Sequence, residues 1–169
     1  MAATNEAIRL YQQGMGRIST TPSSVLGQKQ NTTESVRPNS NPYQQYQQNS
    51  VNTASPQELT LMLYNGLVRF LKLAQQGIDE KDIEKVNNNI IKSQNIITEF
   101  MCTLDMQYEV SNSLYAIYEY MNRRLLEANI KKDKAIIEEV TGYAEELRDT
   151  WVQAMKLAKQ QAVKQQIME

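Results

Sequence analysis

Four successive segments after residue 55 carry apolar side chains at intervals of three and four residues, and this repeat limits the possible folds more than any other feature. Such spacing lines one face of an α-helix with apolar side chains. The positions are Leu59, Met62, Leu63, Gly66, Phe70, Leu71, Ala74 and Ile78; Ile83, Val86, Ile90, Ile97, Met101 and Leu104; Val110, Leu114, Ile117, Tyr118, Met121, Leu125 and Ala128; and Ile136, Val140, Tyr143, Leu147, Trp151 and Met155. Because each helix has to bury its apolar face against another, the chain is predicted to be all-α.

The first helix has the clearest boundaries in the sequence. Ser55 is predicted as its N-cap and Pro56 as its first residue, and Glu58 lies at the third position, where it completes a capping box. Gly77 and Asp79 are expected to end this helix. The other expected boundaries are a start around Asp82, a stop at Asn129 and an N-cap at Asp133.

The short connections between these helices predict an antiparallel up-and-down four-helix bundle over residues 55–160. Beyond Ala158 the sequence is rich in Lys and Gln, so residues 161–169 are expected to fray or to project into solvent. Residues 1–40 are dominated by Ser, Thr, Asn, Gln and Pro, which predicts a largely disordered or weakly helical extension. Residues 41–54 contain Tyr43 and Tyr46, which are either incidental or anchors of this segment on the bundle.

The composition excludes much chemistry. Histidine is absent and Cys102 is the only cysteine, which removes most metal sites and every nucleophile–histidine triad. No catalytic residue, metal ligand or cofactor is predicted, and the chain is not expected to be an enzyme. The net charge of -1 argues against nucleic-acid binding, and no apolar run is long enough for membrane insertion. A lone cysteine suits the reducing cytoplasm, and Cys102 is expected to be buried near a helix end.

Some apolar side chains lie away from the main helix faces. The off-face residues are Leu61, Tyr64 and Val68 on the first helix, Tyr115, Asn122 and Leu126 on the third, and Ile137 and Ala144 on the fourth. Because a four-helix bundle needs one apolar face per helix, the extra positions predict uncovered strips. Such strips fit a groove for a partner, self-association or a cover made by the chain's own tail, and periodicity leaves all three open.

The fourth helix has two further features. Its carboxylates are Glu138, Glu139, Glu145 and Glu146. A paired-acid catalyst needs two carboxyl groups held across a cleft, whereas these alternate with basic residues and are interpreted as a solvated face. Gly142 weakens the helix by about 1 kcal/mol relative to alanine and would permit the close approach of a neighbour.

Two motifs resemble the FliS family of bacterial flagellar secretion chaperones. The segment NPYQQYQQNSVNTASPQELTLMLYNGLVRFL (41–71) has the family's Tyr-containing start, its Ser/Thr-Pro-x-Glu-Leu step into a helix and its Met-Leu-Tyr-Asp/Asn-Gly continuation. The segment YEYMNRRLLEAN (118–129) is similar to the family's second motif, Tyr-x-Tyr-Met-x-x-Arg-Leu-x-x-Ala-Asn. The resemblance covers residues 41–160. Family members usually begin close to the Asn-Pro-Tyr, so residues 1–40 are an addition to the pattern.

The resemblance implies a cytoplasmic bundle of four or five helices that binds the unfolded C-terminal segment of flagellin. Such a chaperone prevents premature polymerisation and delivers flagellin to the flagellar type III export gate. The matching motif residues are Tyr64, Asn65 and Gly66, and Tyr118, Met121, Arg124, Leu125 and Asn129. By motif position, Tyr43, Tyr46, Asn49 and Val51 would form an N-terminal cap over part of the client surface.

Together, the off-face strips and the resemblance predict one set of partner-binding residues. They are Tyr43, Tyr46, Val51, Leu61, Tyr64, Val68, Tyr115, Asn122 and Leu126. The alternative functions are a regulatory helical module that grips a folded partner, and a structural domain that dimerises through Trp151 and the fourth helix. The chain is expected to be a monomer or a weak dimer.

Overall fold

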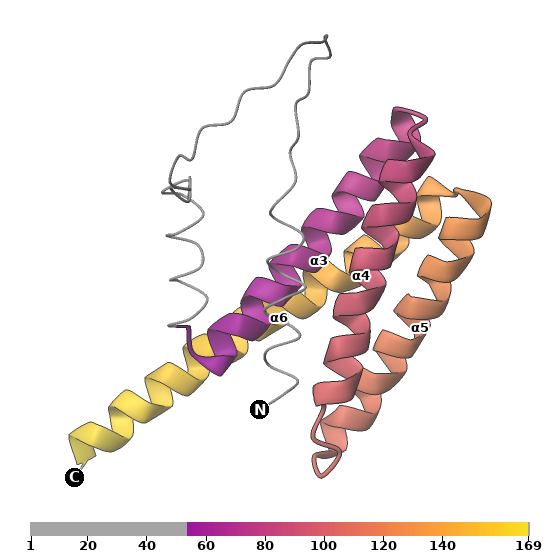
Figure 1. The fold of residues 1–169 in the computed structure, drawn as a ribbon. Coiled ribbons are helices and arrows are strands. Elements are labelled where there is room, and N and C mark those ends of the chain that lie inside the picture. The colour runs from indigo at the N-terminus through magenta and orange to yellow at the C-terminus, as the bar shows by residue number, and fades with distance from the viewer. Residues whose placement is uncertain (1–53, 169) are drawn as a thin grey trace, which may run out of the picture.

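The computed structural model describes residues 54–168, which form four α-helices (Figure 1). In chain order they are α3 (Pro56–Asp79), α4 (Ile83–Thr103), α5 (Glu109–Lys131) and α6 (Lys134–Met168). No strand occurs between residues 54 and 168, so the predicted all-α class is confirmed. The 1–40 extension and almost all of the 41–54 segment lie outside the described residues.

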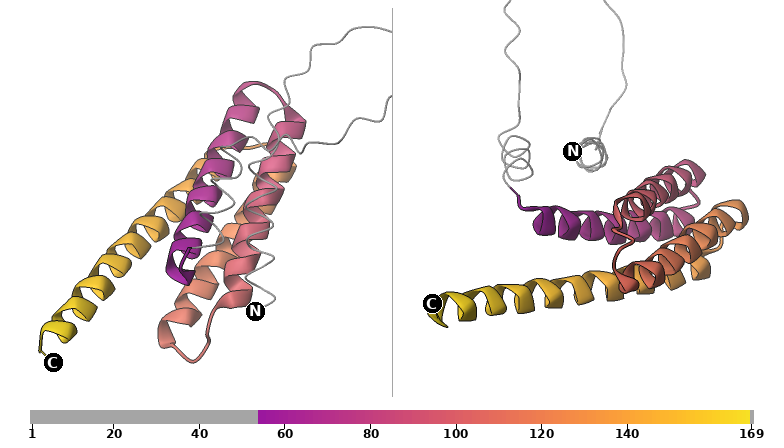
Figure 2. Two further views of the ribbon diagram at one scale, coloured as in Figure 1. Left: turned by 60° about the vertical axis from the view of Figure 1, so that its left-hand side comes forward. Right: turned by 90° about the horizontal axis from the view of Figure 1, so that it is seen from below.

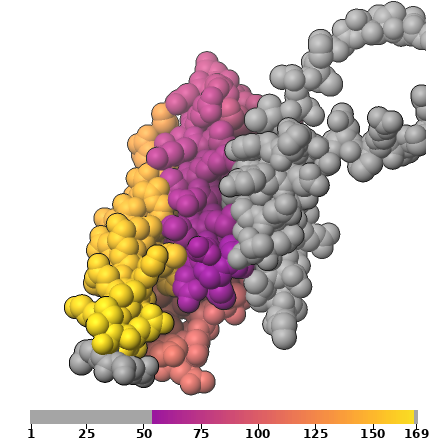
Figure 3. Space-filling view, turned by 90° about the vertical axis from the view of Figure 1, so that its left-hand side faces the viewer, coloured from indigo at the N-terminus to yellow at the C-terminus, as the bar shows by residue number. Residues whose placement is uncertain are grey.

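The four helices form an antiparallel up-and-down bundle, as predicted. Each packs against its neighbours in the chain, and α6 closes the ring by packing against α3. Figure 2 shows the alternating helix directions, and Figure 3 shows α3 and α6 side by side on one face of the molecule. In this ring α4 and α6 lie diagonally, each with α3 on one side and α5 on the other.

The predicted helix starts are confirmed by hydrogen bonds. The Glu58 backbone N–H donates to Ser55 Oγ over 3.3 Å, and the Ser55 backbone N–H donates to Glu58 Oε2 over 2.7 Å, which completes the capping box. Asp82 caps α4 by accepting from the backbone of Lys85. Asp133 accepts similarly from the backbone N–H of Ala135 over 2.9 Å at the start of α6.

Of the predicted helix ends, Asp79 is confirmed as the last residue of α3, whereas Gly77 and Asn129 do not end their helices. Gly77 lies inside α3, and a Cβ atom there would come 3.1 Å from the backbone nitrogen of Val86. Its role is therefore to let the start of α4 approach closely, whereas the reversal occurs at Lys81, which has a φ of 59°. Similarly, α5 continues past Asn129 to Lys131, and its C-cap is Lys132, whose φ of 55° is left-handed.

The core draws apolar side chains from all four helices. The largest fully buried ones are Leu67, Leu71, Val86, Ile90, Ile96, Ile97, Met121, Leu125, Ile137 and Val140. Two residues predicted to face this core, Ile83 and Val110, are exposed because they lie in the first turns of α4 and α5, at the ends of the packed region.

The buried face of α6 also differs from the prediction. Ile137 and Ala144, which were expected off the main face, are fully buried, whereas Tyr143 is partly exposed. The Tyr143 ring packs edge-on against Tyr120 of α5, with centroids 5.7 Å apart, so it lies at the edge of the α5–α6 contact. The core face of α6 is therefore centred on Val140 and turned away from Tyr143.

Cys102 is exposed, contrary to the predicted burial. It lies near the end of α4, as expected, but Phe100 and Met101 take the positions of that turn that pack against the core. Cys102 consequently points to solvent.

The C-terminal part of α6 extends past the start of α3 and away from α4 and α5 (Figures 1 and 2). Side chains from Lys156 to Ile167 are exposed. Residues 161–167 are thus helical and in solvent, and their fraying stays a prediction.

Candidate protein-binding surface

The predicted partner-binding residues of α3 lie mostly inside the bundle. Leu61 is half-buried, whereas Tyr64 and Val68 are only 4% and 5% exposed and belong to the core. The expectation of an uncovered strip on this helix is therefore wrong for these two residues. Tyr43, Tyr46 and Val51 lie outside the described residues, so their proposed cap is a prediction still.

Tyr64 joins an aromatic cluster at one end of the core. Its ring lies 4.5 Å from that of Phe100 and 6.5 Å from that of Trp151, and Phe100 stacks on Tyr118. The Tyr64 and Tyr118 hydroxyl oxygens are 2.5 Å apart. Burial raises the pKa of both tyrosines above the ordinary value, so both stay protonated. Two of the family-like motif positions are thus structural.

The predicted residues of α5 lie on the surface. Leu126 is 55% exposed, Tyr115 is 43% exposed and Asn122 is half-buried. The Gln94 side-chain amide donates to the backbone carbonyl of Asn122 over 3.5 Å, so this part of α5 faces α4. Tyr115 and Leu126 share the face of Asn122 by helical spacing. The structure therefore brings these three residues together at the α4–α5 boundary.

A fourth residue of this surface, Ile91, was missed from the sequence. Lys132 Nζ donates to both Asn87 and Asn129 over 2.7 Å, which sets the antiparallel register of α4 and α5. In this register Ile91, between Asn87 and Gln94, comes level with Leu126. Ile91 is 48% exposed. The sequence does not separate Ile91 from Ile90, because adjacent apolar residues of one helix can both be buried, as Ile96 and Ile97 are.

We call Ile91, Tyr115, Asn122 and Leu126 the α4–α5 strip. It combines large apolar side chains with an unused hydrogen-bond acceptor, because Asn122 Oδ1 is buried and has no hydrogen-bond partner among residues 54–168. A buried acceptor left unpaired costs about 1–3 kcal/mol. The exposed side chains of Ile91, Tyr115 and Leu126 can take a peptide that offers apolar side chains.

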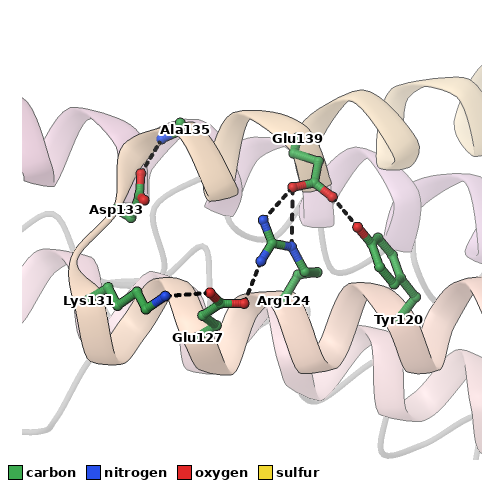
Figure 4. A network of polar contacts seen from close by, with 7 residues as sticks. All are labelled: Tyr120, Arg124, Glu127, Lys131, Asp133, Ala135 and Glu139. Atoms are coloured by element: carbon green, nitrogen blue, oxygen red, sulfur yellow. Dashed lines mark hydrogen bonds and ion pairs between the residues drawn. The ribbon is translucent and has the colours of Figure 1, made fainter.

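The opposite edge of α5 holds a polar network instead (Figure 4). Arg124 donates from Nη2 and Nε to Glu139 Oε2 of α6 over 2.6 and 3.2 Å, and from Nη1 to Glu127. The Tyr120 hydroxyl also donates to Glu139, and Lys131 donates to Glu127 over 2.7 Å. Hydrogen bonds from Arg124 and Tyr120 hold the pKa of Glu139 below its ordinary value.

This network assigns a structural position to Arg124 of the second motif. Its guanidinium links α5 to α6, where the two helices make a smaller contact than α3 and α4 do. Met121 and Leu125 of the same motif are fully buried, and Asn129 accepts a hydrogen bond from Lys132. The motif therefore builds the bundle, while Asn122 and Leu126 between its positions reach the surface.

Two classes of site are absent from the part of the chain that the structure describes. There, no group of three or more Cys, His, Asp or Glu side chains could hold a metal ion. None of the four helices combines the length and apolarity needed to span a bilayer.

Comparisons with known proteins all point to one family. A family model described as "Flagellar protein FliS" matches residues 39–158. The "Flagellar secretion chaperone FliS" of Bacillus subtilis (strain 168) is 55% identical over 116 residues, which cover 69% of this chain and 87% of the relative. The protein of the same name from Salmonella typhimurium is 33% identical over 109 residues, or 63% of this chain and 81% of the relative.

A solved structure shows the same fold. The chain titled "Crystal structure of flagellar chaperone from bacteria" aligns with a TM-score of 0.57 at 17% identity. The alignment covers 68% of the present chain and 95% of that one.

Proposed function

The chain belongs to the FliS family of flagellar chaperones, and we propose that it binds the C-terminal, unfolded segment of flagellin. This is a family of chaperones and not of enzymes, which confirms the prediction of a non-enzymatic protein. Binding would prevent premature polymerisation of flagellin in the bacterial cytoplasm and would aid the export of flagellin by the flagellar type III apparatus. The export gate is proposed as a further partner. No cofactor takes part in this function.

The observation that supports this proposal is the α4–α5 strip. Leu126, Ile91 and Tyr115 are all more than two-fifths exposed along two adjacent helices. A client segment that becomes helical on this surface would cover them with side chains spaced by three and four residues. The apolar area buried offsets the entropy of ordering the client, which is on the order of 2–5 kcal/mol.

The other predicted contact residues have different parts in the proposal. Leu61 is half-buried on α3 and can extend the client surface at that helix. Tyr64 and Val68 would act from the core by keeping α3 in place, so direct contact with the client is proposed for neither. Tyr43, Tyr46 and Val51 are proposed to cover part of the client surface when flagellin is absent.

A matched pair of leucine substitutions tests the binding site. Leu126→Gln removes an apolar side chain from the strip, and Leu157→Gln removes an equally exposed leucine from the projecting part of α6. Calorimetric titration with the C-terminal flagellin peptide should show affinity lowered about 10-fold by Leu126→Gln, since partial burial of a leucine is worth about 1.4 kcal/mol. Leu157→Gln should leave the affinity unchanged.

Two results would contradict the proposal in different ways. Equal affinities of both variants and the parent would remove the strip from the client site. Absence of any heat with the peptide, together with binding of a folded flagellar protein, would favour the alternative of a regulatory module that acts on a folded partner.

A further inference from the structure

The outward side of α6, opposite its core face, carries a stripe of segregated charge. Helical periodicity places on this side Glu138, Gly142, Glu146, Asp149, Gln153, Lys156, Gln160, Lys164 and Ile167. The acidic members all precede residue 150, and the basic members all follow residue 155. Each of the nine is exposed. We call this set the α6 stripe.

Most charges of the α6 stripe are not used within the bundle. Glu146, Lys156 and Lys164 take part in no ion pair among residues 54–168. Glu138 has only a 4.0 Å contact with Lys134 in the preceding turn. The adjacent network of Arg124 and Glu139 lies on the side of α6 that faces α5 and leaves the stripe free.

Gly142 lies in the acidic half of the α6 stripe and has no role in the packing of the bundle. A Cβ atom built on it would have nothing within 4 Å, in contrast to Gly77. Glycine in a helix interior is destabilising by about 1 kcal/mol relative to alanine, so open space does not require it here. It is the point of the stripe where another backbone can approach most closely.

We infer that the α6 stripe pairs with the α6 stripe of a second copy of this chain, with the two helices antiparallel. α6 spans residues 134–168, so full antiparallel overlap places the two-fold axis at residue 151. This register sets Lys164 opposite Glu138 and Lys156 opposite Glu146, and the symmetry forms each pair twice. Gly142 then lies opposite Gln160. A parallel arrangement would instead set acidic residues against acidic residues.

The inferred dimer is independent of the proposed client site. α6 is diagonal to α4 in the bundle, so pairing through the outward side of α6 leaves the α4–α5 strip uncovered. Because the contacts are exposed ion pairs with few apolar side chains, the dimer should be weak and sensitive to salt. Two chaperone copies could then each hold a client segment.

Charge reversal provides a test with an internal rescue. One variant carries Lys156→Glu and Lys164→Glu, and the other carries Glu138→Lys and Glu146→Lys. The matched control, Lys159→Glu with Arg123→Glu, changes the net charge as much as the first variant does but lies off the stripe. Mass is measured by sedimentation velocity of the full chain against protein concentration, at roughly 0.02 M and roughly 0.3 M salt.

The dimer predicts a specific pattern of masses. The parent and the control should dimerise at low salt, with an association constant at least about 10-fold lower at high salt. Each charge-reversed variant alone should be monomeric, and an equimolar mixture of the two should form a heterodimer, because all opposed pairs are again complementary. Circular dichroism of each variant verifies that the bundle is folded.

Other outcomes would overturn the inference. A parent that is monomeric at every concentration excludes the dimer and would leave the basic half of α6 for an acidic partner protein. A dimer that survives both reversals, or a mixture that stays monomeric, excludes this pairing of α6. The affinity for the flagellin peptide, measured by calorimetric titration, should be the same in the charge-reversed variants and the parent. A failure of the proposed client binding is thereby distinguished from a failure of the inferred dimer.

Discussion

At the scale of single residues, the hydroxyl pair of Tyr64 and Tyr118 shows how motif residues can serve the fold. The two side chains are 4% and 2% exposed, and one hydroxyl donates to the other inside the bundle, between the diagonally placed helices α3 and α5. Only one hydrogen of the pair is used, so the pair depends on both oxygens being present. A sequence motif gives no information on this dependence, because it lies between residues far apart in the chain.

Removing both hydroxyls should cost less than the sum of the two single removals. Tyr64→Phe or Tyr118→Phe alone leaves a buried hydroxyl without its partner, and each should lower the free energy of unfolding by about 1–3 kcal/mol. In the double variant two rings of the same shape remain and no hydroxyl is orphaned. Urea denaturation of the four proteins should therefore show a loss for the double variant smaller than the sum of the single losses. Additive losses would contradict the coupling.

At the scale of helices, glycines at two positions of the bundle have opposite roles. Gly77 permits the close approach of α3 to the start of α4, whereas Gly142 lies on the outward side of α6 with open space around it. The sequence places both inside amphipathic patterns and so does not separate a packing glycine from a free one. Only the contact of Gly77 with Val86 in the folded structure separates the two glycines. The sequence does not contain this contact, and Gly77 was therefore predicted as a helix end.

Alanine at these two glycines should change stability in opposite directions. Gly142→Ala should raise the free energy of unfolding by up to about 1 kcal/mol, since the helix gains propensity and nothing is displaced. Gly77→Ala gains the same propensity, but its Cβ meets the backbone nitrogen and Cγ2 of Val86 at 3.1 and 3.0 Å, so α4 has to shift. We expect a net loss at Gly77 in urea denaturation. Equal stabilisation by Gly142→Ala and Gly77→Ala would contradict this expectation, because it would show that α4 shifts away from the new Cβ atom at little cost in free energy.

At the scale of the whole molecule, the sequence predicts the bundle better than the surface. Apolar periodicity predicts the number of helices between residues 54 and 168 and their order, and the Ser55 capping box predicts the start of α3. The same periodicity does not determine how far each helix turns about its axis. Tyr64 and Ile137 consequently proved to be core, while Ile91 was overlooked and Cys102 proved to be exposed. These are consequences of packing, which single-helix patterns do not contain.

The central claim is that the α4–α5 strip receives the flagellin segment. The most direct measurement is to follow the backbone amide resonances of the isotope-labelled full chain as the C-terminal flagellin peptide is added. We expect the largest shifts at Ile91, Tyr115, Asn122 and Leu126, with those of the outward side of α6 unchanged. Shifts confined to α6, or a spectrum that does not change, would contradict the account.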